Sequence, residues 1–420
     1  MIKPIYICII LIFASCNSKN TFTKNSDMTA EKLLGNPEYQ AICYGGYRTK
    51  TREVQPTLAQ LKEDMIILEA MNIKFIRTYN VHYDEVKNLL KVISDLKKER
   101  PGFEMYMMLG AWIDCKNAFT EYQPIHDQES DRNAIEIEEA VRLANQYPDI
   151  VKVLAVGNEA MVKWATSYFV TPDIILKWVN YLQDLKKENK LPKDLWITSS
   201  DNFASWGGGD TIYHVKELIE LYHAVDYVSI HTYPMHDTHY NPVFWGVNED
   251  DNQLTEKQKI DAAMLRAKIY AVSQYKSVHK YMTSLGINKP IHIGETGWAT
   301  HSNEHYGDEG SHAADEYKSA IFYKGIKDWS DSVGITCFYF EAFDEQWKDA
   351  ANPKGSENHF GLINLKSEAK YALWDLVDDG KFENMTRDGK PITKTFQGNI
   401  QSLMHQVKAP PSLHELNTHK

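Results

Sequence analysis

The architecture of the protein can be read from the stretch Val151-Lys152-Val153-Leu154-Ala155-Val156-Gly157-Asn158-Glu159. It is an apolar run of strand length, rich in valine, that ends in polar residues. A strand without alternation of polar and apolar residues is typical of a parallel sheet covered on both faces. The stretch Ile291-His292-Ile293-Gly294-Glu295-Thr296 has the same character and also reaches a glutamate near its end. The two stretches therefore predict buried parallel strands that each end near a carboxyl group.

Six further runs of strand length surround these two, and segments of helical period separate them. Thr57 with Gln60 forms a capping-box pattern at one helix start, and Pro172 directly after Thr171 marks another. Eight strands, each followed by a helix, predict an α/β fold of the (β/α)8 TIM-barrel type. The predicted strands are residues 41–48, 73–80, 103–114, 151–159, 195–202, 227–233, 291–296 and 335–343, and the predicted helices include 57–71, 315–330 and 368–377.

An open, doubly wound sheet is the alternative architecture. It requires a glycine-rich phosphate loop after the first strand, and Tyr44-Gly45-Gly46-Tyr47-Arg48 lacks the GxGxxG spacing. No low-complexity tract or Pro/Gly-rich linker divides residues 40–380, so the sequence predicts a single domain with a short C-terminal extension. The predicted boundaries are 1–15 for a signal peptide, 16–37 for a tether, 38–380 for the barrel and 381–420 for the extension.

The N-terminal sequence indicates where in the cell the protein resides. A basic start is followed by an apolar run over residues 5–13, which has the length of a signal peptide and is too short to span a membrane. The run ends in Phe13-Ala14-Ser15-Cys16, which resembles a bacterial lipobox with Cys16 as the lipidated residue. The alternative is a plain secretory signal with an incidental cysteine. We expect a lipid-anchored protein of the bacterial cell envelope.

Composition excludes several classes of partner. The 420 residues carry 46 Lys and Arg against 57 Asp and Glu, a net charge of −11, which disfavours nucleic acid. Cys43, Cys115 and Cys337 show neither a disulfide framework nor zinc spacing, and we expect them to be buried as small apolar residues. The 16 histidines contain no HExxH pattern, and we expect His231 and His236 to be core or loop residues. We predict no metal, no cofactor and a monomer.

Glu159 and Glu295 lie at the ends of the predicted fourth and seventh strands. In a TIM barrel the active site lies at the C-terminal ends of the strands, so both carboxyl groups face the same mouth. A retaining glycosidase needs such a pair, with one carboxylic acid to protonate the leaving oxygen and one carboxylate to attack the anomeric carbon. A lone strand-end glutamate is often merely solvated, but two at matching strand ends indicate glycoside hydrolysis.

The motifs around these glutamates resemble those of a known family. Asn158-Glu159 and Gly294-Glu295-Thr296-Gly297-Trp298 resemble clan A, the 4/7 glycosidase superfamily. Within it, glycoside hydrolase family 17 is similar over about residues 40–378, including Ile76-Arg77-Thr78-Tyr79 and the run from Phe340 to Lys348. The resemblance implies a β-glucanase, with endo-1,3-β-glucanases (laminarinases), mixed-linkage enzymes and glucanosyltransferases among the relatives.

The resemblance also implies residue roles. Glu159 is the expected general acid/base and Glu295 the expected nucleophile, whose charge raises the pKa of Glu159. Asn158 is expected to bind the sugar 2-hydroxyl, and Tyr233 to hold the nucleophile. The motif residues expected to line the substrate site are Arg77, Tyr79, Glu345, Lys348 and Glu357. The sequence departs from the family pattern at two places. Gly45-Gly46 in the first strand is expected to open the non-reducing end of the cleft, and the long polar segment 240–254 leaves the cleft length open.

Aromatic residues at strand ends are candidates for stacking on sugar rings, although each position is equally compatible with core packing. Trp298 and Phe343 are the best candidates because they lie within motif runs, and Asp201 and Asn202 are expected hydroxyl partners, with turn capping as their alternative. The other aromatic candidates are Tyr47, Tyr79, Trp112, Trp206 and Trp245.

The expected reaction is endo-acting, retaining hydrolysis of laminarin-type β-1,3-glucan. The acidic run 248–252 and the polar loop 302–310 offer no stacking platform for an acceptor sugar, which favours hydrolysis over transfer. The alternatives are a β-1,3-glucanosyltransferase of the same fold, a non-catalytic glucan-binding surface lipoprotein and a barrel with a purely structural role. A non-catalytic barrel is expected to lack Glu159 or Glu295, and both are present.

Overall fold

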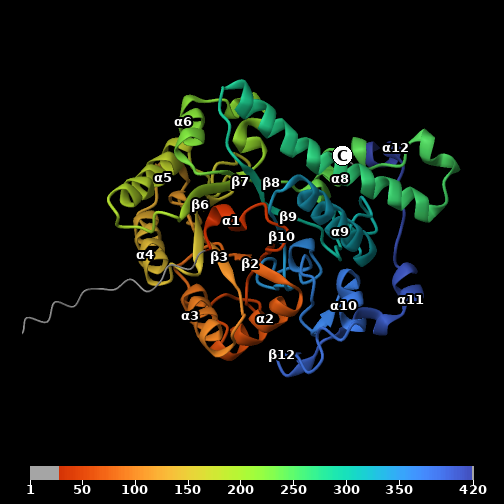
Figure 1. Ribbon diagram of the computed structural model, residues 1–420. Coiled ribbons are helices and arrows are strands. Elements are labelled where there is room, and N and C mark those ends of the chain that lie inside the picture. Colours follow the sequence, from red (N-terminus) through yellow and green to blue (C-terminus); the bar gives the residue numbers. More distant parts are fainter. Residues whose placement is uncertain (1–27, 419–420) are drawn as a thin grey trace, which may run out of the picture.

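Eight parallel strands close into a barrel in the computed structural model, which describes residues 28–418 (Figure 1). Each strand pairs with its neighbours in chain order, and β1 pairs with β10 to close the ring. The predicted TIM barrel is therefore confirmed, with every predicted strand present. The barrel strands are β1 (Gln40–Cys43), β2 (Ile73–Arg77), β3 (Tyr106–Ala111), β6 (Val151–Asn158), β7 (Trp196–Asn202), β8 (Val228–His231), β9 (Ile291–Gly297) and β10 (Cys337–Phe340).

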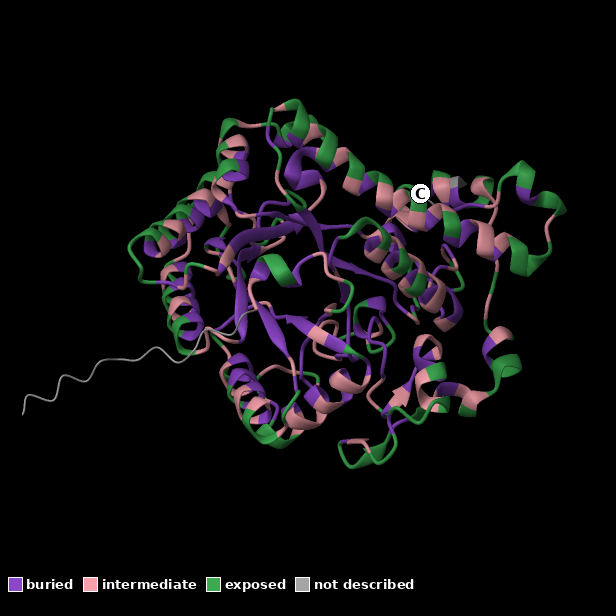
Figure 2. Ribbon diagram, viewed as in Figure 1, coloured by how far each residue is buried: buried purple, intermediate pink, exposed green. Residues whose placement is uncertain are grey.

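Helices surround the barrel, and the strands inside it are buried (Figure 2). The capping box of Thr57 and Gln60 opens the first of the large helices, and Pro172 occupies the first turn of another. Gly334 ends the last one in a left-handed conformation, which glycine adopts without a steric penalty. The covering helices are α2 (Leu58–Ala70), α3 (Asp84–Glu99), α4 (Arg132–Gln146), α5 (Pro172–Lys187), α6 (Lys216–Ala224), α8 (Glu256–Ser284) and α9 (Glu316–Val333).

Smaller elements occupy the loops and the C-terminal part. The hairpin of β4 (Cys115–Lys116) and β5 (Ile125–Glu129) follows β3, and α7 (Pro234–Tyr240) follows β8. The predicted helix over 368–377 is wrong in its first half, where β11 (Glu368–Ala369) pairs with β14 (Thr393–Lys394) instead. The remaining short elements are α10 (Trp374–Asp378), β12 (Thr386–Arg387), β13 (Lys390–Pro391), α11 (Ile400–Met404) and α12 (Leu413–Thr418).

The segments on either side of the barrel pack against it. The expected tether is wrong for residues 28–37, because α1 (Ala30–Leu33) buries Ala30 and Leu33 completely. Gly35 N donates to Thr336 Oγ1 at 2.8 Å, which places this segment at the N-terminal ends of the strands, away from the predicted active site. In the extension, Arg387 Nε donates to the buried Asp64 of α2 at 2.9 Å. The described part of the extension therefore covers the barrel wall.

The membrane prediction falls outside the described residues. Residues 1–15, Cys16 and the first part of the tether lie there. Over residues 28–418, no helix is long and apolar enough to cross a bilayer. In the same range Cys43, Cys115 and Cys337 form no disulfide. Cys43 and Cys115 are buried as expected, whereas the expectation is wrong for Cys337, which is only partly buried at the start of β10.

Candidate active site

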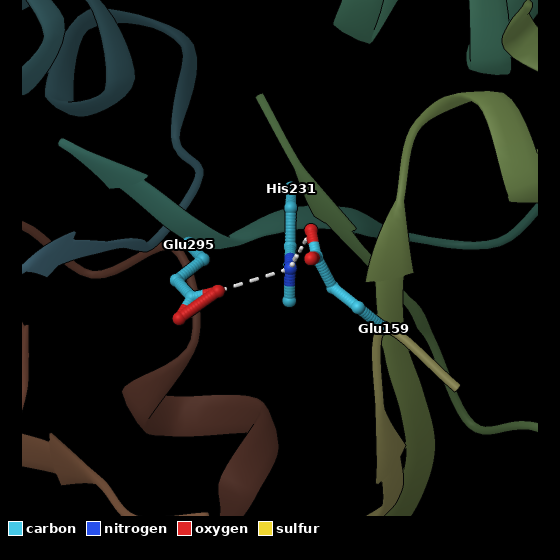
Figure 3. Close-up of side chains that lie close together, drawn as sticks. All are labelled: Glu159, His231 and Glu295. Carbon is cyan, nitrogen blue, oxygen red and sulfur yellow. Dashed lines mark hydrogen bonds and ion pairs between the residues drawn. The ribbon is translucent and has the colours of Figure 1, made fainter. Parts of the chain in front are cut away.

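Glu159 and Glu295 stand at the C-terminal ends of β6 and β9 and face each other across the barrel mouth (Figure 3). The chain turns sharply after β6, because Gly157 (φ 78°) and Glu159 (φ 45°) are both left-handed. A non-glycine residue rarely holds this conformation, and such strain concentrates at functional sites. The Glu159 amide donates to Ser200 O of β7 at 3.0 Å, which fixes the turn.

His231, the last residue of β8, lies between the two carboxylates (Figure 3). Its Nδ1 is 3.1 Å from Glu159 Oε1 and 3.0 Å from Glu295 Oε2. One ring nitrogen of His231 and one oxygen of each glutamate lie within 4.8 Å of one another. This separation is close to the roughly 5–5.5 Å between carboxyl groups in retaining glycosidases and shorter than the roughly 6.5–9.5 Å in inverting ones.

His231 is uncharged near neutral pH. Burial, helped by the Arg77 guanidinium, lowers the pKa of His231 to about 3, although the Glu295 carboxylate opposes the change. Nδ1 lies 3.0 Å from the Glu295 carboxylate, which can only accept a hydrogen bond, so the single proton belongs on Nδ1. Nε2 then accepts from the Ser200 hydroxyl at 2.8 Å, and Ser200 in turn contacts Ser229 at 2.8 Å. This chain fixes the ring between the glutamates.

This position of His231 between the two catalytic glutamates was not predicted from the sequence. A signal was present, because Ser229 and His231 alternate with Val228 and Ile230 in a strand that is otherwise apolar. Alternate residues of a barrel strand point inward, so the polar pair had to face the barrel interior.

Burial raises the pKa of Glu159 and thereby favours its protonated form. The Glu357 carboxylate adds to the increase, whereas His236, Arg77 and the Asn202 amide oppose it. The expected cause was the charge of Glu295, so the direction is as predicted while the main cause is removal from water. A carboxyl group whose pKa is raised keeps its proton to higher pH, as a general acid requires.

Glu295 is buried and has two supporting groups from β2 and the residues after it. The Tyr79 hydroxyl donates to Glu295 Oε1 at 2.7 Å, and Arg77 Nη1 lies 3.7 Å from the same oxygen. Tyr79 is therefore the hydroxyl that holds the nucleophile, a role predicted for Tyr233. Tyr233 instead stacks on His236, with ring centroids 5.0 Å apart.

Arg77 also orients Asn158. Its Nη2 donates to Asn158 Oδ1 at 2.5 Å, and its Nη1 donates to Gly294 O at 2.7 Å. The guanidinium thus joins β2, β6 and β9 beneath both catalytic residues. Since the Asn158 oxygen is occupied, its amide nitrogen remains as a donor toward the sugar, as the predicted contact with the 2-hydroxyl requires.

Lys348 lies in a buried acidic cluster after β10. Its Nζ contacts Glu341 Oε2 and lies 3.1 Å from Glu345 Oε2. Glu345 is only 2% exposed, and its other oxygen accepts from Trp347 Nε1 at 3.0 Å. Glu345, predicted to line the substrate site, therefore positions Lys348 and is itself covered by protein.

Glu357 faces His236 at the same mouth, with 3.7 Å between Oε1 and Nε2. Burial alone would lower the pKa of His236, but the neighbouring Glu357 carboxylate raises it overall. The imidazolium in return lowers the pKa of Glu357 against the effect of burial. The two residues form an ion pair beside Glu159, which agrees with the predicted place of Glu357 at the site.

Several residues that were predicted to contact sugar are buried in the protein instead. Trp298 is 0% exposed and donates to Ala313 O at 2.8 Å, and Phe343 is 1% exposed, so neither ring has a free face. Trp206 and Trp245 are also fully buried. Asp201 is fully buried as well and accepts from the Met161 amide at 2.7 Å, so it holds the loop after β6. Several residues of the motif runs therefore pack in the core around the mouth and do not line it.

Asn202 has a double role. Its Oδ1 accepts from Ala204 N at 3.0 Å, which is the turn capping that was the alternative to sugar binding. Its amide also lies close enough to Glu159 to lower the pKa of that carboxyl. Trp112 remains half-exposed near the mouth, as a stacking residue must be.

One cluster of carboxylates and histidine within the described chain has the spacing of a metal site, and it is the catalytic trio itself. His231 Nδ1 carries the ring proton and is hydrogen-bonded to Glu159 Oε1, and a protonated nitrogen has no lone pair for an ion. The absence of a metal or cofactor stays a prediction.

Comparison with known families identifies one family over most of the chain. Residues 41–361 match the BtgE/BtgC glycoside hydrolase domain. The chain belongs to this family. Both Glu159 and Glu295 and the supporting Arg77, Tyr79 and His231 fall inside the matched region.

Relatives of the family include fungal proteins and solved bacterial and fungal structures. A probable glucan endo-1,3-beta-glucosidase of Aspergillus terreus is 23% identical over 371 residues, which are 83% of this chain and 48% of that protein. A glucan endo-1,3-beta-glucosidase of Emericella nidulans is 25% identical over 78% of this chain and 41% of that protein. The chain thus spans less than half the length of these fungal relatives.

Among solved structures, an endo-laminarinase from Formosa Hel1_33_131 is 63% identical, with a TM-score of 0.91 over 92% of this chain and 98% of that one. A family 17 β-1,3-glucanosyltransferase from Rhizomucor miehei is 17% identical, with a TM-score of 0.54 over 80% of this chain and 96% of that one. At that identity the second likeness shows a shared fold.

Proposed function

We propose that this protein is an endo-acting, retaining hydrolase of laminarin-type β-1,3-glucan. The observation that carries the proposal is the pair Glu159 and Glu295, with oxygens within 4.8 Å, in a chain 63% identical to an endo-laminarinase. The spacing supports the retaining mechanism, and the relative supports the substrate.

The reaction follows from the positions of the two glutamates. The Glu295 carboxylate attacks the anomeric carbon, the bond to the leaving oxygen breaks, and the proton of Glu159 passes to that oxygen. The product is a glycosyl ester on Glu295. Water then attacks the same carbon, Glu159 takes the water proton, and Glu295 leaves as a carboxylate. The His231 Nδ1–H remains between the carboxyl groups and keeps both in place through the two steps.

Glucanosyl transfer is the second candidate, because it uses the same intermediate with a sugar hydroxyl in place of water. We expect hydrolysis to dominate, so laminarin gives short 1,3-linked oligosaccharides as the main early products. A time course analysed by chromatography with size standards tests this, with lichenan and a β-1,6-glucan as comparison substrates. Early products longer than an added oligosaccharide would instead establish transfer.

We also propose a lipid anchor on Cys16, supported by the lipobox-like run before it. Two or more acyl chains are enough for stable membrane attachment. Wild type expressed with its leader is expected in the membrane fraction, and Cys16→Ala in the soluble fraction. Cys43→Ala, which removes a buried thiol in β1, is the control and is expected to fractionate as wild type. Equal solubility of wild type and Cys16→Ala contradicts the anchor.

A further inference from the structure

Three aromatic rings gather at one side of the barrel mouth. Tyr168, in the loop after β6, lies 5.3 Å from Trp112 and 5.4 Å from Phe119 between ring centroids. The Phe119 and Tyr168 rings are stacked at 25°, and Trp112 and Phe119 are 6.4 Å apart. We call Trp112, Phe119 and Tyr168 the aromatic platform.

Two loops build the platform and are joined by their backbones. Cys115 N donates to Tyr168 O at 3.1 Å, and Phe119 N donates to Ser167 O at 3.4 Å. Arg132 of α4 holds the first loop by pairing with Asp114 at 2.6 Å. The β4–β5 hairpin and the loop after β6 therefore act as one support, and the rings keep a fixed relative position.

Phe119 is the residue that core packing does not explain. It is 59% exposed, and its backbone is left-handed at φ 57°. A bulky residue pays a steric penalty in that conformation, and a phenyl ring gains little from solvent. Strain that persists at an exposed ring points to a binding role, because the cost is then recovered when a ligand covers the ring.

The platform is continuous with the catalytic centre. Tyr168 belongs to the loop that directly follows Glu159 and β6, and Trp112 directly follows β3, the strand that pairs with β6. The two loops therefore leave neighbouring strands at the mouth where Glu159 and Glu295 lie, and the exposed Phe119 ring stacks on Tyr168 there. A ligand that occupies both the catalytic centre and this platform must be long and must present apolar ring faces, as a chain of β-linked glucosyl rings does.

We propose that the aromatic platform is an accessory subsite that binds glucosyl units of the β-1,3-glucan beyond those at the catalytic residues. This rests on the proposed function. It makes the enzyme sensitive to chain length, because only chains long enough to reach Phe119 gain the additional stacking contact.

The test replaces Phe119 with asparagine, which removes the ring but tolerates the left-handed backbone better than other residues do. We expect KM for laminarin and for laminarihexaose to rise about tenfold, as loss of a covered aromatic ring implies, and KM for laminaritriose to change less than about twofold. Phe119→Tyr is expected to restore the wild-type chain-length dependence. The control is Tyr181→Ala, which removes a ring 40% exposed on the outer helix α5 and is expected to leave all three KM values as in wild type.

Binding measurements separate this proposal from the proposed function. In a Glu295→Gln background, calorimetry with laminaritriose and laminarihexaose reports binding without turnover. A selective loss of hexaose affinity in Phe119→Asn, with no fall in melting temperature, supports the platform even if wild type cleaves neither sugar. Equal effects on both chain lengths, or none, would overturn the platform while leaving the catalytic assignment intact.

Discussion

Glu295→Gln is expected to abolish turnover of laminarin, with kcat lower by at least about 10⁴-fold, as loss of a nucleophile costs in enzymes that use a covalent intermediate. The amide is close in size to the carboxylate and can still contact Tyr79 and Arg77, so the site keeps its shape. It cannot form the glycosyl ester. Initial rates of reducing-end formation on laminarin measure the effect. Calorimetry is expected to show that the variant binds laminarihexaose with an affinity within about fivefold of that of the wild-type site.

The matched control is Glu309→Gln, which makes the same change on the polar loop after β9 at an exposed carboxyl group. It is expected to have wild-type kcat. Full activity of Glu295→Gln would show that the covalent step uses another group. Loss of both activity and binding would show that the amide disrupts the contacts from Arg77 and Tyr79, and Glu295→Ser would then distinguish structural from chemical loss.

The barrel and its two glutamates were predictable from the sequence because both depend on local patterns. Valine-rich runs such as residues 151–156 have no stable place except a sheet covered on both faces, and the carboxyl at the end of each run must then reach the mouth. The capping residues Thr57 and Thr255 are equally local, since each satisfies amides of its own first turn.

The contacts among strand ends were less predictable, because they depend on barrel geometry rather than on spacing. Trp298 follows a catalytic strand but turns into the core, where its indole nitrogen finds Ala313 O. Tyr233 follows β8, the neighbour of the strand that carries Glu295, and Tyr79 follows β2, which does not pair with that strand. Only the three-dimensional arrangement across the barrel decides that Tyr79 donates to Glu295. His231 required the same arrangement, since its role depends on two glutamates more than 60 residues away on either side.

The packing of residues 28–37 and the aromatic platform were also not predictable from local sequence patterns. Polar residues near an N-terminus suggest a tether, yet Ala30 and Leu33 find a buried place at the bottom of the barrel. Phe119 lies in a polar hairpin without any recognisable motif, and its importance emerges only from its exposure, its backbone angle and the ring of Tyr168. Long-range packing decides both cases.

Glu159→Ala is expected to lower kcat/KM on laminarin by about 10²–10⁴-fold, the usual contribution of general acid–base catalysis. Because burial raises the pKa of Glu159, wild-type kcat/KM is expected to fall as the pH rises through that elevated value, where the acid loses its proton. The variant has no such proton to lose, so this alkaline decline is expected to disappear. Rates between pH 4 and 9 on laminarin measure both effects.

The decisive experiment on this variant uses an aryl β-laminaribioside with a good leaving group and added azide. Such a leaving group needs little protonation, so the glycosyl ester on Glu295 forms and then accumulates, since no base activates water. Azide is already an anion and needs no base, so it is expected to restore turnover of Glu159→Ala and to leave wild type little affected. Two inversions at the anomeric carbon give a β-configured azide, identified by NMR. An α-configured azide would mean a single displacement and would overturn the assignment of Glu295 as nucleophile, whereas a failure of azide to accelerate the variant would show that Glu159 is not the acid–base.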